Sequence, residues 1–242
     1  MHRAASIQLL VSVTLVLSAL ACGKEAPKPV RRTPPAGTGV SRNAMPTGPA
    51  EYAIVVKSTW TPARHPFEYP SGAHFSGLIG ASHNANYSIF VVGSRPTPGL
   101  ERLSEEGKHS PLDDEIHAAI SAGNALAMFE TGGLKNFRDS LVATVRVDPR
   151  HPLVSVVNMV APSPDWFTGA ANVNLVENGA WVRSRTLMLP AYDSGGDDGT
   201  TYKARDRDTN PKKATSRAAT RHFVTKGRVR SVATIVFTRT SP

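Results

Sequence analysis

Aspartate residues gather in two turn-forming segments, and each segment follows a strand-like run. Asp165 lies in the segment Pro-Ser-Pro-Asp-Trp-Phe-Thr-Gly (162–169), and Asp193 and Asp197 lie in Pro-Ala-Tyr-Asp-Ser-Gly-Gly-Asp-Asp-Gly (190–199). If the two preceding runs are strands with the same direction, both loops emerge at one end of the fold. Carboxylates brought together repel one another unless a cation lies between them. Ca²⁺ suits such a place because it accepts irregular cages of carboxylate and carbonyl oxygens on loops.

The acidic loops have two other interpretations. An EF-hand counted from Asp193 would need Gly at its sixth position and Glu at its twelfth, where this chain has Asp198 and Ala204, so that motif is excluded. A solvated turn remains open, since Asp-Gly clusters are common turn chemistry. For one loop alone the turn is the better interpretation, whereas two such loops favour a metal ion.

Signatures of catalysis are missing from the sequence. It contains no G-x-S-x-G elbow, no H-E-x-x-H pair and no phosphate-binding glycine loop, and its single cysteine is Cys22. We therefore expect a non-catalytic protein. A metal-dependent hydrolase stays an alternative, because a calcium ion held by carboxylates can polarise a phosphoryl oxygen.

The N-terminus has the layout of an export signal. Arg3 precedes an apolar run from Ile7 to Ala21 that is short for a transmembrane helix, and the run leads through small residues into Cys22. This junction resembles a bacterial lipobox, in which the cysteine is lipidated. We predict a signal peptide over 1–21 and a membrane anchor on Cys22, on an exported protein of the bacterial cell envelope or surface. An ordinary signal peptide beside a cysteine is the alternative.

The rest of the chain divides into a linker and one domain. Residues 22–50 are rich in Pro and Gly and lack periodic apolar residues, which is typical of an extended linker. Residues 51–242 are long enough to bury a single core without disulfides. The net charge is +9, and the segment 203–230 holds ten Lys or Arg against two Asp. That basic segment is either a solvated loop or a site for anionic glycans or lipid headgroups; we expect no nucleic-acid partner.

Strand-like runs dominate the domain. They are rich in β-branched residues and separated by Pro, Gly, Asn or Asp, which favours an all-β antiparallel sandwich. The expected strands are 52–57, 87–92, 140–147, 153–161, 181–189 and 229–238. One helix is expected from a Ser110 cap with Pro111 at its first position to about Ile120, with Leu112, Ile116 and Ile120 on its buried face.

Three segments in order resemble the spondin domain family of F-spondin and mindin type. They are Tyr-Pro-Ser-Gly-Ala-His-Phe-Ser-Gly-Leu-Ile-Gly-Ala-Ser-His-Asn-Ala-Asn-Tyr (69–87), the runs 151–155 and 161–169, and Tyr-Asp-Ser-Gly-Gly-Asp-Asp-Gly-Thr (192–200). The resemblance implies a β-sandwich of about eight strands with short helical insertions. It places calcium ligands on Asp165, Asp193 and Asp197, and it implies a role in extracellular adhesion or ligand recognition.

Aromatic and histidine residues near these segments allow two interpretations each. Trp166 and Phe167 could insert into a membrane, although Trp166 packed beneath the loop is the better interpretation. His74 and His83 could form a second metal site, but buried structural histidines are expected instead.

Overall fold

The computed structural model describes residues 45–133 and 140–241, which belong to one compact unit. The predicted signal peptide, Cys22 and most of the predicted linker lie outside the described residues. Within the described part of the chain, no helix is both long enough and apolar enough to cross a membrane.

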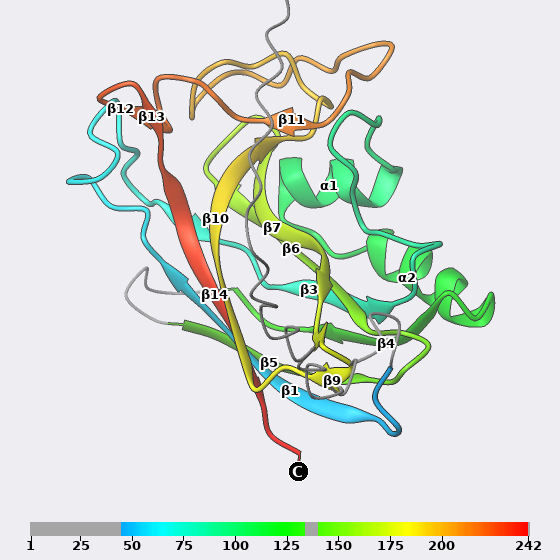
Figure 1. The fold of residues 1–242 in the computed structure, drawn as a ribbon. Helices are drawn as coiled ribbons and strands as arrows, with labels where there is room; N and C mark the ends of the chain where they lie inside the picture. The colour runs from blue at the N-terminus through cyan, green and yellow to red at the C-terminus, as the bar shows by residue number, and fades with distance from the viewer. Residues whose placement is uncertain (1–44, 134–139, 242) are drawn as a thin grey trace, which may run out of the picture. The chain divides into compact units, whose positions relative to one another are not determined.

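Eight strands form the main path of an antiparallel β-sandwich, so the predicted fold class is confirmed (Figure 1). The path runs β4-β3-β6-β7-β10-β14-β1-β5. Its strands are β1 (Ala50–Ser58), β3 (Ile79–His83), β4 (Ala125–Glu130), β5 (Ser140–Val147), β6 (Leu153–Ala161), β7 (Trp166–Asn174), β10 (Ser184–Asp193) and β14 (Ser231–Arg239). Shorter strands are β2 (His74–Phe75) on β6, β11 (Ser216–Arg217) on β10, and the pairs β8 (Val176–Glu177) with β9 (Ala180–Trp181) and β12 (Val224–Thr225) with β13 (Arg228–Val229).

Strand β10 joins the two halves of the sandwich. Its first part pairs with β14, its last residues from Ala191 to Asp193 pair with β7, and the register shifts between Leu189 and Pro190. Proline has no N–H to donate, so it is tolerated at such a break in the ladder. The break delivers Asp193 to the second half of the sandwich, beside β7.

The core has two parts that stack the domain into three layers. One apolar cluster fills the space between the halves of the sandwich, with Tyr52 and Ile54 of β1 facing residues such as Val154 of β6. The second cluster packs α1 (Pro98–Glu106) on the outer face of β6 and β7, and α2 (Leu112–Ser121) beside α1 on β4 (Figure 1). Strand β6 is therefore buried on both faces, which explains why it is apolar except for Ser155 and Asn158.

The predicted strand Tyr87–Val92 is wrong. This segment is a loop in which Ile89 and Phe90 are buried but Val91 and Val92 are exposed. Its place in the sheet is taken by β3, which pairs with β4 and β6. The Phe90 ring packs against Phe167 and Tyr192, so packing on the helix side of the sheet, and not strand pairing, accounts for the apolar residues.

The predicted helix is present but begins later than expected. Pro111, and not Ser110, is the N-cap residue, because the first helical hydrogen bond runs from the Glu115 N–H to the Pro111 carbonyl. Leu112 and Ile116 are fully buried as predicted, whereas Ile120 is only partly buried.

The two acidic loops leave the sandwich at the same end. Strands β6 and β10 both run antiparallel to β7 and therefore share one direction. We call this end, formed by 162–165 and 193–199, the apex. The opposite end, where Ala50 enters β1 and Arg239 ends β14, is the base. The predicted convergence of the acidic loops is thus confirmed.

Candidate functional site at the apex

Asp165 lies at the centre of the apex with no solvent exposure. Its Oδ2 accepts hydrogen bonds from the Ser194 hydroxyl (3.0 Å) and from the backbone N–H groups of Gly195 (2.9 Å), Gly196 (2.9 Å) and Asp197 (3.3 Å). Successive N–H groups that point inward form a concave anion-binding site. The acidic loop is therefore folded around the carboxylate of Asp165.

Two adjacent glycines allow this close wrapping. Gly195 has a φ of +86°, and a Cβ there would lie 2.5 Å from the Lys213 carbonyl oxygen. A Cβ on Gly196 would lie 2.6 Å from Oε1 of Glu105. A side chain at either position would push the loop away from its neighbours.

Asp193 and Asp197 flank the central carboxylate. Asp193 accepts a hydrogen bond from the Gly195 N–H (3.0 Å), and Asp197 accepts from the N–H groups of Gly199 and Arg207. Burial, together with the negative charge of Asp165, raises the pKa of Asp193 to about 6. Burial also raises the pKa of Asp165, against the opposing effect of its N–H donors. The apex thus holds like charges close together in a partly dehydrated place.

These side chains suit a cation in chemistry but do not form a finished cage. Within the described residues, no three His, Cys, Asp or Glu side chains are arranged to hold a metal ion. Oδ1 of Asp165 is nevertheless buried without any hydrogen-bond partner. Each carboxylate oxygen has two lone pairs, so an N–H bond does not exclude a metal. The residues present fit an oxygen-seeking ion such as Ca²⁺, which Asp165, Asp193 and Asp197 would hold.

Helix α1 adds a carboxylate that sequence reasoning missed. Oε1 of Glu105 is buried without a partner. Burial, with added repulsion from Glu101, Asp165 and Asp197, raises the pKa of Glu105 to about 7. The helix itself was detectable from the sequence, since Thr97 caps the Leu100 N–H, Pro98 follows it, and Gly107 closes the helix with a φ of +68°.

A small acidic cavity opens beside this carboxylate. Its volume is about 200 Å³, and four of its lining residues are acidic. The lining residues are Glu105, Glu106, Ser163, Pro164, Asp197, Ala204 and Asp206. The apex therefore has an open face on the side of α1 that a small cation can reach.

Part of the basic segment neutralises the apex. The Lys212 ammonium contacts Glu101 (2.6 Å) and Asp208 and donates to the Gly196 carbonyl (3.2 Å), and Lys213 pairs with Asp198. The contacts with Asp208 and Glu101 raise the pKa of Lys212 despite its partial burial. Two of the ten positive charges therefore serve the acidic loops.

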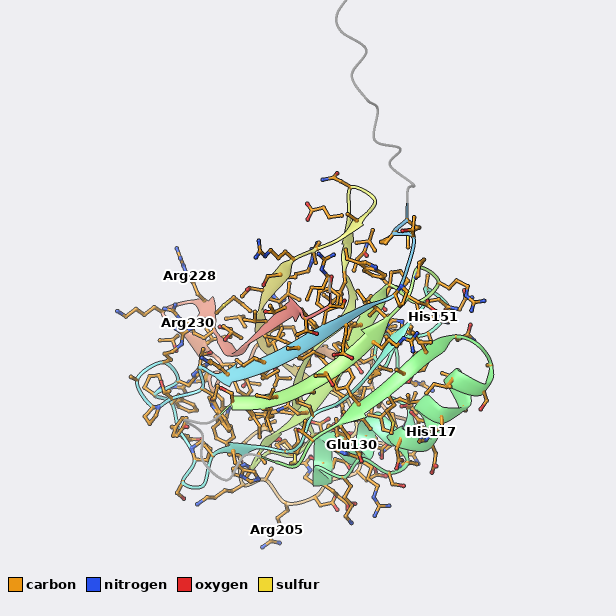
Figure 2. All side chains as sticks on the ribbon, turned by 90° about the horizontal axis from the view of Figure 1, so that it is seen from below. His117, Glu130, His151, Arg205, Arg228 and Arg230 are labelled. Atoms are coloured by element: carbon orange, nitrogen blue, oxygen red, sulfur yellow. The ribbon has the colours of Figure 1, made fainter. Side chains whose placement is uncertain are left out.

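The remaining basic residues do not form one patch. Figure 2 shows Arg228 and Arg230 together on one side of the molecule and Arg205 at a different edge. The guanidinium of Arg221 lies 4.1 Å from the centre of the Phe67 ring. The basic residues of the segment 203–230 thus lie at several separate places on the surface of the domain.

The aromatic residues of the first loop are structural. Trp166 and Phe167 have no solvent exposure, so insertion of either into a membrane in this conformation is contradicted. Trp166 packs against Phe223 and Tyr202, with ring centres 5.0 and 5.2 Å apart. This packing holds the backbone beside Asp165.

His74 and His83 lie too far apart to share a metal ion. They pair with opposite ends of β6, at Ala161 and Leu153, which places them about 26 Å apart. His83 is fully buried and lies within hydrogen-bond distance of the Ser155 hydroxyl (2.7 Å), as expected of a structural histidine. His74 is exposed, so its expected burial is wrong.

Comparison with known proteins identifies the family of this fold. The family model Spondin_N matches residues 50–226. The chain belongs to the spondin N-terminal family. This spondin domain is 33% identical to Spondin-2 of Rattus norvegicus and 32% identical to Spondin-2 of Homo sapiens over 166 residues, which are 67% of this chain and 50% of each relative. It is 30% identical to Spondin-1 of Rattus norvegicus over 170 residues, 68% of this chain and 21% of that relative. The chain thus spans about half the length of the Spondin-2 proteins it matches.

Proposed function

We propose that this spondin domain is a non-catalytic recognition module that works outside the cell, with calcium ordering its apex. The observation that carries the proposal is the meeting of the two acidic loops at Asp165, where one buried carboxylate oxygen has no partner. Burial and the negative charge of Asp165 raise the pKa of Asp193, and a cation bound by Asp165, Asp193 and Asp197 would relieve the repulsion. The apex loops would then present a fixed surface to a ligand.

The proposal includes export and a lipid anchor on Cys22. The apolar run before Cys22 supports export, and the lipobox-like junction supports attachment to a bacterial membrane. Membership of the spondin family supports adhesion or ligand recognition as the role of the module. Its ligand is expected at the cell surface or in the surrounding matrix.

Thermal unfolding of the purified protein with excess calcium and with chelator tests the metal site. At a calcium concentration a hundredfold above Kd, the native state should gain roughly 2.7 kcal/mol. Asp193→Ala/Asp197→Ala should abolish the calcium-dependent rise in Tm. Glu177→Gln, an exposed carboxylate on β8, is the matched control and should keep it.

Equal Tm values of the wild type in calcium and in chelator would refute the calcium site. If the site is present, binding of the protein to immobilised matrix glycoproteins and cell-surface polysaccharides should fall in chelator. Calcium-independent binding would separate recognition from the apex.

A further inference from the structure

A groove beside the apex collects arginines from three separate segments. Its volume is about 350 Å³, and its lining holds three arginines, two exposed apolar residues and no carboxylate. The lining residues are Arg64, Met188, Pro190, Arg217, Val229, Arg230 and Ser231. We call it the arginine groove.

Hydrogen bonds to backbone groups hold the three arginine-bearing segments in place. The Arg64 carbonyl accepts from the Thr225 hydroxyl (2.9 Å), and the Arg230 N–H donates to the Phe223 carbonyl (2.8 Å). Arg217 lies on β11, which pairs with the end of β10 through Tyr192. The groove is therefore set by the fold and does not depend on one flexible loop.

Among the residues that the structure describes, the positive charge of the groove has no ion-pair partner. Across residues 45–133 and 140–241, no ion pair includes Arg64, Arg217 or Arg230. The hydrogen bond of Arg64 to the Ser231 hydroxyl is long, at 3.5 Å. Together with burial, the charge of Arg64 lowers the pKa of the neighbouring His65 to about 4. The positive charge of Arg64 therefore also acts on a buried side chain.

Three guanidinium groups around one groove favour a doubly charged tetrahedral oxyanion. Guanidinium presents a planar fork of donors that matches phosphate oxygens in pairs. Met188 (56% exposed) and Val229 (39% exposed) lie in the same groove and offer an apolar contact. A phosphate group attached to an apolar chain would use both features.

We propose that the arginine groove binds the phosphate group of an amphiphilic phosphoester, through Arg64, Arg217 and Arg230. The phosphate would lie among the guanidinium groups, and the adjoining carbons would lie on Met188 and Val229. This site is separate from the acidic apex and does not require calcium. Its ligand could be a membrane phospholipid or a soluble phosphoester with the same chemistry.

Isothermal titration of the purified protein with octyl phosphate, in chelator, tests the groove. We expect binding that is tighter than that of inorganic phosphate, because the alkyl chain adds apolar contact. Arg64→Ala and Arg217→Ala should each weaken it about tenfold, the loss expected for a charge-assisted hydrogen bond. Arg205→Ala, which removes an exposed charge elsewhere (Figure 2), should leave the Kd within twofold.

Three results would overturn the proposal: no measurable binding of octyl phosphate, equal affinity for inorganic phosphate, or an equal loss in the Arg205 variant. Circular dichroism of each variant establishes that it is folded, and Arg64→Lys and Arg217→Lys are second variants should an alanine change impair folding. Sedimentation with phosphatidylcholine vesicles containing phosphatidic acid distinguishes the source. Vesicle binding that depends on Arg64 and Arg217 supports a lipid ligand, and binding of octyl phosphate alone supports a soluble one.

Discussion

At the apex, the carboxylate of Asp165 is fully buried, and four donors point at one of its oxygens. In the arginine groove, by contrast, the side chains of Arg64 and Arg217 face solvent, and the described ion pairs include neither residue. At the apex, the hydrogen-bond donors of the acidic loop bind the carboxylate of Asp165. In the groove, the guanidinium donors of Arg64 and Arg217 are available to a ligand. One region is built to need a counter-ion in order to be well ordered, and the other is ordered already and has donors to offer.

The largest change in stability that tests this comparison is expected for substitution of Asp165. Asp165→Ala should lower the free energy of unfolding by about 4 kcal/mol in chelator, because the buried N–H donors of the acidic loop lose their acceptor. Urea denaturation measures the change. Asp208→Ala, at an exposed carboxylate, should cost less than about 1 kcal/mol. Equal costs would mean that the acidic loop is not organised around Asp165.

His65 reports the electrostatic surroundings of the groove. It is fully buried, and its pKa of about 4 lies below that of the unfolded chain, so the unfolded state binds a proton first as the pH falls. The contribution of His65 to stability should therefore be complete above about pH 6.5 and decrease by about 2 to 3 kcal/mol toward pH 4. The raised pKa values of Glu105 and Asp193 act in the opposite direction over this range, because the folded state binds their protons first. Urea denaturation should therefore compare the two proteins at each pH, and the stability of the wild type relative to His65→Gln should fall as the pH falls.

An exposed histidine and a groove variant sharpen this measurement. His117→Gln on α2 should keep the full pH dependence of the wild type. In Arg64→Ala, the pKa of His65 measured by NMR should rise, because a positive neighbour has been removed. An unchanged pKa would show that the charge of Arg64 is neutralised in solution.

The smallest expected effect concerns Lys212, the basic residue that belongs to the apex. Lys212→Met should cost about 1 kcal/mol of stability in chelator, since its ion pairs are partly exposed. It should also tighten calcium binding about threefold, because one positive charge beside the site is lost. Titration calorimetry measures both the variant and Lys203→Met, an exposed control that should match the wild type. Weaker calcium binding in Lys212→Met would contradict a cation site at this place.

Local pattern predicted those parts of the fold in which neighbours in sequence are neighbours in space. The β-branched runs identified β1, β5 and β6, and the turn chemistry around Asp193 identified the acidic loop. The segment Tyr87–Val92 misled because its apolar residues pack on Phe167 and Tyr192, and no strand pairs with it. Periodicity alone does not distinguish these two uses of apolar residues.

Long-range placement could not be predicted in the same way. Glu105 reaches the apex because α1 packs on β6 and β7, and no local pattern links it to Asp165. Arg64 meets Arg217 and Arg230 only through the turn of chain after β1 and the pairing of β10 with β11. Such contacts depend on tertiary packing. The count of basic residues along the chain therefore predicted the net charge of the segment 203–230, but it did not predict that these residues divide between the apex and the arginine groove.

The opposite placement of the base and the apex has a mechanical consequence. The chain enters β1 at Ala50 in the base, and β1 is bonded along both edges, to β14 and to β5. Ladder hydrogen bonds lie perpendicular to the strands, so a force applied along β1 loads the bonds of both ladders in shear and together. A pull between the residues preceding Ala50 and a ligand held at the apex would follow this direction. The domain would then resist tension as a unit, with its lifetime under load governed by the unfolding rate of the whole sandwich.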